Sequence, residues 1–103
     1  MASYTYDVAL NNRDTIFDSE SDFEDIESVV EWVEKHGGEF NVQIVKQRGD
    51  TMIFHEHFCL DGGKWYLYYY DRWYAIPRDL IADYFAAPEP WDFIRANKLR
   101  EAH

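Results

Sequence analysis

Hydrophobic and polar side chains alternate along several short stretches of the chain, which is the pattern of half-buried β-strands. Tyr4 to Leu10 alternates first, and the ranges 39–47 and 51–60 repeat the pattern. The aromatic-rich ranges 64–70 and 73–76 predict one more hairpin. Turn-forming residues separate these stretches at Arg48-Gly49-Asp50, Asp61-Gly62-Gly63 and Asp71-Arg72.

A different spacing from Asp22 to Lys35 predicts an α-helix, because apolar residues recur there every three to four positions. Ser21 is a suitable N-cap and Glu24 follows three residues later, so the pair is expected to form a capping box. Gly37-Gly38 ends the helix, and residues 13–20 before it are expected to form an acidic loop. The core face of this helix consists of Phe23, Ile26, Val29, Val30 and Val33, with Trp32 at its border.

Prolines divide the C-terminal part of the chain. Pro77 is expected to begin a short helix that runs through Phe85, and Pro88 and Pro90 to separate it from a last helix at 90–101. The predicted fold class is α+β, with an antiparallel β-meander of four to five strands. An N-terminal acidic helix and two short C-terminal helices pack on this meander, and residues 1–103 form a single domain.

The charge of the chain is distributed unevenly, which changes the expected partners. Residues 1–34 contain ten acidic residues against Arg13 alone, a balance of −9, whereas residues 35–103 contain ten acidic and nine basic residues, a balance of −1. Direct binding of nucleic acid or of an anionic membrane through the first third is therefore disfavoured. The partner that this charge indicates is a basic protein.

The remaining composition indicates a cytoplasmic protein. The single cysteine, Cys59, cannot form an intrachain disulfide, which favours a reducing compartment. The N-terminus lacks the pattern of a signal peptide, and no apolar run approaches the roughly 20 residues that span a bilayer.

The acidic segment 14–34 is the first candidate partner-binding site. Six carboxylates on the predicted helix of about 21 Å would be spaced at about 3.5 Å, close to the phosphate spacing of one DNA strand. Trp32 is expected to add apolar anchorage. The alternative is an ordinary solvated helix face preceded by a solubilising loop. The candidate acids are Asp18, Glu20, Asp22, Glu24, Asp25, Glu27, Glu31 and Glu34.

The aromatic hairpin is the second candidate surface. Tyr66, Tyr68 and Tyr70 point to the same side of the predicted strand, and tyrosine is a frequent anchor in protein interfaces. A partner or a second copy of the chain would dock on these rings. The alternative is a sheet that the terminal helices cover on both faces.

A His-x-His-x-Cys strand is a third, weaker candidate. His55, His57 and Cys59 share one face and form a candidate metal set, with His36 or His103 as a fourth ligand. The alternative is a structural strand face. Because the chain lacks a phosphate-binding loop, a nucleophile elbow and a His-Glu-x-x-His helix, we expect neither an enzyme nor a cofactor.

The acidic helix with its Glu24, Glu27, Glu31 and Glu34 face, together with the small sheet, resembles in type the short acidic proteins with which bacteriophages block host defences. These include anti-CRISPR and anti-restriction proteins. The resemblance is one of composition and architecture, and it implies an inhibitor that occupies the basic nucleic-acid-binding surface of a nuclease or CRISPR complex. The chain is similar in the same way to immunity proteins that neutralise basic nuclease toxins, so a toxin-immunity protein is the alternative. A small metal-binding domain or enzyme that uses the His-x-His-x-Cys strand is a further, less favoured alternative.

Overall fold

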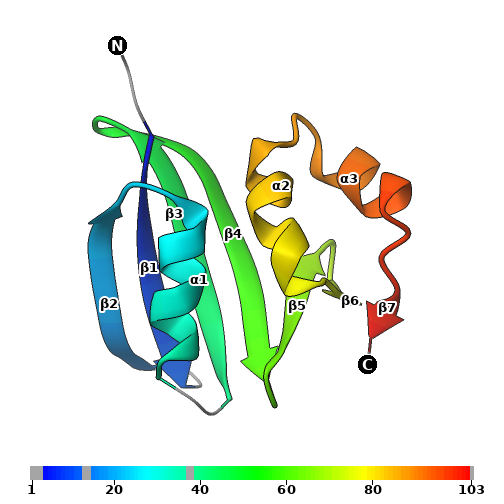
Figure 1. Ribbon diagram of the computed structural model, residues 1–103, viewed down its shortest axis with the longest axis horizontal. Coiled ribbons are helices and arrows are strands. Elements are labelled where there is room, and N and C mark those ends of the chain that lie inside the picture. Colours follow the sequence, from blue (N-terminus) through cyan, green and yellow to red (C-terminus); the bar gives the residue numbers. More distant parts are fainter. Residues whose placement is uncertain (1–3, 13–14, 37–38, 103) are drawn as a thin grey trace.

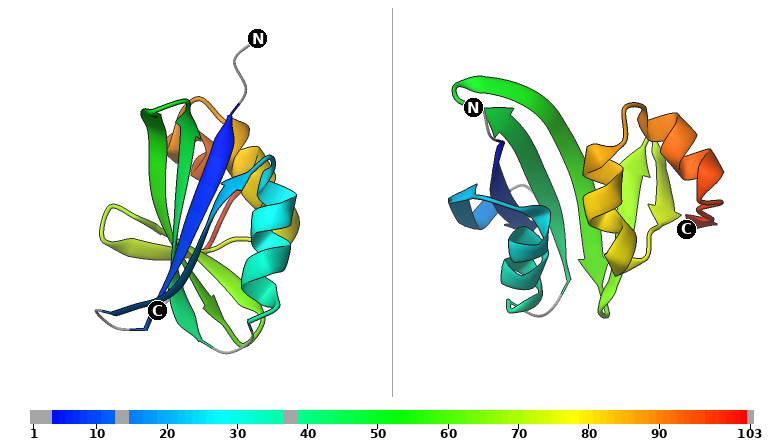
Figure 2. Two further views of the ribbon diagram at one scale, coloured as in Figure 1. Left: turned by 90° about the vertical axis from the view of Figure 1, so that its left-hand side faces the viewer. Right: turned by 45° about the horizontal axis from the view of Figure 1, so that its top comes forward.

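One antiparallel sheet of seven strands organises the part of the chain that the computed structural model describes, residues 4–12, 15–36 and 39–102 (Figure 1). The strand order is β2-β1-β3-β4-β5-β6-β7, so the first hairpin forms one edge. Figure 2 shows that the sheet is strongly twisted. The strands are β1 Thr5–Asn12, β2 Thr15–Phe23, β3 Phe40–Arg48, β4 Thr51–Asp61, β5 Lys64–Tyr69, β6 Arg72–Ala75 and β7 Glu101–Ala102.

The helices pack on one face of this sheet and leave the other face open (Figure 2). α1 buries Ile26, Val29, Val30 and Val33 against it. α2 packs through Phe85, whose ring centroid lies 5.8 Å from that of Phe58 on β4. The helical elements are α1 Ile26–Glu34, the 3-10 turn η1 Arg78–Leu80, α2 Ile81–Ala86 and α3 Pro90–Ala96.

Strand register explains why a single core forms under the helices. Directly paired residues of antiparallel strands point to the same face, and one paired row crosses five strands. Every member of the row is buried, with at most 8% of its surface exposed. The row consists of Leu10, Val42, Phe58, Leu67 and Tyr74.

The structure confirms the α+β class and the antiparallel sheet, but the number of strands was underestimated. The predicted loop at 13–20 is wrong for the residues that the structure describes, because residues 15–23 form the edge strand β2. Backbone pairing with β1 outweighs the low strand propensity of this polar, acidic segment.

The same pairing displaces the start of the first helix. Phe23 still pairs with Tyr6, so α1 begins only at Ile26. Asp25 is the N-cap, and its Oδ1 accepts a hydrogen bond of 2.8 Å from the Ser28 backbone N–H. The predicted Ser21–Glu24 capping box is therefore wrong. The expected stop at Gly37-Gly38 lies outside the described residues.

The last helix is shorter than predicted and makes room for the seventh strand. α3 ends at Ala96, because Lys98 adopts the left-handed conformation with φ +52°. The backbone N–H groups of Lys98 and Leu99 then donate to the carbonyls of Arg95 and Ile94, which is the Schellman pattern of a helix end. The chain leaves the helix in time for β7 to pair with β6. Within the described ranges no helix is long and apolar enough to cross a membrane.

Candidate partner-binding surface

β2 and α1 lie side by side at one end of the sheet and carry most of the excess negative charge (Figure 1). Residues 15–35 contain eight acidic residues and one lysine. The structure places three of these acids on the edge strand, two in the connection to the helix and three on the helix itself, whereas six had been predicted on the helix. In that order they are Asp18, Glu20 and Asp22; Glu24 and Asp25; and Glu27, Glu31 and Glu34.

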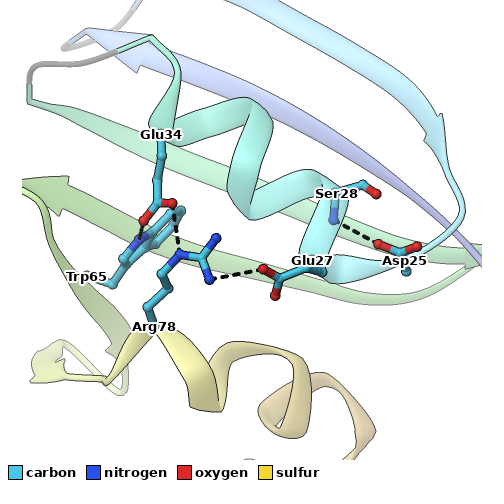
Figure 3. A network of polar contacts seen from close by, with 6 residues as sticks. All are labelled: Asp25, Glu27, Ser28, Glu34, Trp65 and Arg78. Atoms are coloured by element: carbon cyan, nitrogen blue, oxygen red, sulfur yellow. Dashed lines mark hydrogen bonds and ion pairs between the residues drawn. The ribbon is translucent and has the colours of Figure 1, made fainter.

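Two of the helix carboxylates are bound to Arg78 at the start of η1 (Figure 3). The Arg78 Nε donates to Glu34 Oε1 at 2.8 Å, and its Nη1 donates to Glu27 Oε1 at 3.0 Å. The indole N–H of Trp65 donates to the second oxygen of Glu34 at 3.1 Å. Burial acts to raise the pKa of Glu34, but the hydrogen bonds from Arg78 and Trp65 outweigh it and the pKa is lowered. Glu27 and Glu34 thus tie α1 to the C-terminal part of the fold.

A third acid joins β2 to the end of α1. Asp18 Oδ2 lies 2.7 Å from His36 Nε2, and His36 Nδ1 lies 2.8 Å from the Trp32 carbonyl oxygen. Because carboxylate and carbonyl oxygens both accept, both contacts are satisfied when each ring nitrogen carries a proton, so the arrangement favours the protonated imidazole. The Asp18 hydrogen bond raises the pKa of His36 accordingly. Trp32 is half-buried against this ring and Phe23, so little of it is available as an anchor.

Four acids form no ion pair and do not cap the helix, although Glu20 accepts a long hydrogen bond of 3.4 Å from the neighbouring Ser21 N–H. Asp25 is used as the helix N-cap. The remaining four side chains are exposed and make no ion pair with any residue that the structure describes. We call them the uncommitted carboxylates: Glu20, Asp22, Glu24 and Glu31.

The predicted tyrosines do not join this acidic surface. Tyr68 pairs with His57 and Tyr66 with Cys59, so both lie on the open face of the sheet, opposite α1. The hydroxyl of Tyr68 donates to Asp71 at 2.8 Å. Tyr70 occupies the turn between β5 and β6 and is 81% exposed. Acids and tyrosines therefore form two separate surfaces.

The His-x-His-x-Cys strand lies on the open face as the alternation predicts. The ring centroids of His55 and His57 are 4.9 Å apart. Burial raises the pKa of the Cys59 thiol and lowers the pKa of His57, so both groups are uncharged at neutral pH. Among the described residues no three His, Cys, Asp or Glu side chains are placed to hold a metal ion. The suggested fourth ligand His36 is bonded to Asp18, and His103 lies outside the described residues.

The open face also carries a pocket that was not predicted. It has a volume of about 430 Å³. The polar alternation of β3 placed Asn41 and Gln43 on the outward side, but a single strand does not show what stands beside them. The side chains that build the pocket are Asn11, Asn41, Gln43, His57, Tyr68 and Trp73.

No protein-family model, curated protein or solved structure matches the chain. Its function is therefore inferred from charge, burial and side-chain chemistry. Among the described residues, two surfaces are considered for binding: the acidic end, formed by β2, α1 and their connection, and the open-face pocket.

Proposed function

We propose that this protein is an inhibitor that occupies the basic nucleic-acid-binding surface of a bacterial defence nuclease or CRISPR complex. The observation that carries the proposal is the local excess of carboxylates on β2 and α1. Of the described cations, only His36 and Arg78 form ion pairs with them. A surface of this sign attracts a lysine- and arginine-rich groove and accelerates association with it.

Protection of the sheet edge explains only part of this charge. Charged side chains on an edge strand discourage pairing with another sheet, which accounts for Glu20 and Asp22 on β2. Glu31 lies on the helix α1 and Glu24 in the connection, where no strand edge needs protection. On α1, Glu31 lies four residues after Glu27 and three before Glu34, and like charges at these helix spacings repel one another. Its presence therefore favours a role in binding over a role in stability.

Competition with DNA tests the proposal directly. A panel of purified basic targets, comprising restriction nucleases, CRISPR effector complexes and a nuclease toxin, is bound to fluorescent DNA, and the protein is added at low and at physiological salt. We expect displacement of DNA from a target, more strongly at low salt. The variant Glu20→Gln/Asp22→Asn/Glu24→Gln/Glu31→Gln should displace DNA at least about tenfold less well, because four interfacial charges are lost. Displacement from the toxin alone would favour the immunity-protein alternative.

A matched variant tests whether the location of the removed charges matters, or only their number. Asp50→Asn/Asp79→Asn/Asp83→Asn/Asp92→Asn removes the same number of charges from exposed positions outside β2 and α1. We expect this control to displace DNA like the wild type. The proposal is refuted if the two fourfold variants displace DNA equally well, or if the wild-type protein displaces DNA from none of the targets.

A further inference from the structure

Two cross-strand rows on the open face bring polar and aromatic side chains together. In the first row, Asn11 of β1 pairs with Asn41 of β3. In the second, Gln43 of β3 pairs with His57 of β4. The second row continues through Tyr68 of β5 to Trp73 of β6. Neighbouring side chains on one face of a sheet lie within contact distance, so the six residues line one pocket of about 430 Å³.

Asn11 contributes a mostly buried polar side chain to the pocket. It is the only polar residue of the described chain that is buried, with 7% of its surface exposed. Its side chain lines the pocket, and its amide is not among the buried side-chain polar atoms that lack a partner in the described residues. The register between β1 and β2 shifts at this position, and such irregularities commonly re-aim a side chain beside a site. An amide that lines a pocket can donate and accept hydrogen bonds with a ligand or water in it.

The pocket is electrically neutral in a protein with a net charge of −10. Burial and the neighbouring His55 lower the pKa of His57, so its imidazole is uncharged at neutral pH. A phosphate or carboxylate ligand would find no cation in the lining, and a cationic ligand no carboxylate. Three amides supply both hydrogen-bond donors and acceptors, although the Gln43 Oε1 already lies within hydrogen-bond distance of His55 Nε2, at 3.3 Å. These groups match a neutral ligand that has many hydroxyl groups.

The two aromatic residues supply the complementary apolar wall. The rings of Tyr68 and Trp73 lie with centroids 4.9 Å apart. The hydrogen bond from the Tyr68 hydroxyl to Asp71 holds the first ring in place. An aromatic wall beside a few oriented polar groups is the usual composition of a small-molecule site. A sugar ring combines hydroxyl groups at its rim with an apolar C–H face.

We propose that the pocket formed by Asn11, Asn41, Gln43, His57, Tyr68 and Trp73 binds a neutral carbohydrate. The aromatic wall packs on the C–H face of a sugar ring, and the three amides bond its hydroxyl groups. This site lies on the face opposite α1, so it is independent of the proposed acidic surface. Binding involves no covalent step.

Nuclear magnetic resonance tests the site with defined probes. The isotope-labelled protein is titrated separately with glucose, galactose, N-acetylglucosamine, maltose and cellobiose, and with adenosine as a neutral stacking ligand of a different class. We expect saturable shifts of the side-chain amide signals of Asn11, Asn41 and Gln43 and of the Trp73 indole N–H with at least one sugar. The variant Asn41→Ala should weaken that sugar about five- to tenfold, the effect of losing one or two hydrogen bonds.

The control is chosen from the same strand. Gln47→Ala removes an amide of β3 that does not line the pocket, and it should leave sugar affinity unchanged. Asn41 is exposed, so its replacement should preserve the spectrum of the remaining residues and report on binding alone. Absence of saturable shifts with every sugar, equal weakening by both variants, or binding of adenosine without any sugar would overturn the assignment.

Discussion

At the scale of single residues, Glu56 is the carboxylic acid whose position is least favourable. It pairs with the buried Ile44 and therefore points under α2, beside Tyr84 and Phe85. Burial raises its pKa. The hydroxyl of Tyr84 is also buried, and the Glu56 carboxyl is close enough to influence its pKa. Burial and then the nearby Glu56 carboxylate raise the pKa of Tyr84.

The raised pKa of Glu56 predicts a specific dependence of stability on pH. Between the ordinary glutamate pKa and the raised value, the folded state binds more protons than the unfolded state, so stability falls as pH rises through this window. Glu56→Gln should abolish that decline and raise the free energy of unfolding at neutral pH by about 1 kcal/mol, because a neutral amide is cheaper to bury. Urea denaturation across acidic and neutral pH measures both effects.

The matched control is Glu31→Gln on the exposed side of α1. In this variant the free energy of unfolding should still fall as pH rises above the ordinary glutamate pKa. If wild type and Glu56→Gln show the same decline, the Glu56 carboxyl is not the group responsible.

At the scale of elements, the β4–β5 hairpin depends on the backbone conformation of two glycines. Gly62 and Gly63 have φ values of +60° and +78°. A Cβ added to either residue would meet no atom within 4 Å, so the penalty for a side chain lies in the backbone alone. Gly63→Ala should lower the free energy of unfolding by about 1–2 kcal/mol.

Substitution by asparagine distinguishes backbone strain from steric crowding as the cause of this penalty. Gly63→Asn is larger than Gly63→Ala, yet asparagine tolerates the left-handed region better. We expect Gly63→Asn to be the more stable of the two variants in chemical denaturation. The reverse order would show that crowding, and not backbone strain, governs the turn.

The elements also show how far a sequence pattern determines this fold. Alternation and helical spacing predicted most strands of the sheet and the three helices, because each of those signals is local. β2 was not predicted, because Asp18-Ser19-Glu20-Ser21-Asp22 contains no apolar residue and becomes a strand only through pairing with β1. β7 was missed because it is short and follows a helix end that depends on the positive φ of Lys98.

The candidate site, too, could be predicted from the sequence only in part. The acids of β2 and α1 were visible in the sequence, but their separation into bonded and uncommitted groups was not. Arg78 lies 44 residues from Glu34 and 51 from Glu27. The open-face pocket depends on register as well, since only pairing places Asn11 beside Asn41. Neither the Arg78 ion pairs nor the Asn11–Asn41 strand pairing leaves a recognisable pattern in the neighbouring sequence.

At the scale of the whole molecule, charge is separated along the fold. The acidic end at β2 and α1 has a strong excess of carboxylates, whereas acids and bases nearly balance in the rest of the chain. A surface maintained for binding commonly costs stability. The uncommitted carboxylates Glu20, Asp22, Glu24 and Glu31 should therefore destabilise the free protein through mutual repulsion.

This repulsion predicts that the variant Glu20→Gln/Asp22→Asn/Glu24→Gln/Glu31→Gln is more stable than the wild type at low salt. Removal of four like charges from β2, α1 and their connection should contribute about 1 kcal/mol, which corresponds to a rise in Tm of about 5 °C for a chain of this size. Added salt should remove the difference, because it screens exposed charges. Thermal unfolding followed by circular dichroism at low and high salt measures both.

The variant Asp50→Asn/Asp79→Asn/Asp83→Asn/Asp92→Asn shows whether the effect is local. It lowers the net negative charge by the same amount, but Asp79, Asp83 and Asp92 lie in the first turns of η1, α2 and α3, where negative charge is favourable. Its Tm at low salt should stay level or fall. An equal rise in both variants would mean that total charge, and not the crowding on β2 and α1, destabilises the fold. That result would contradict the view that the carboxylates of β2 and α1 are retained for a partner at the expense of stability.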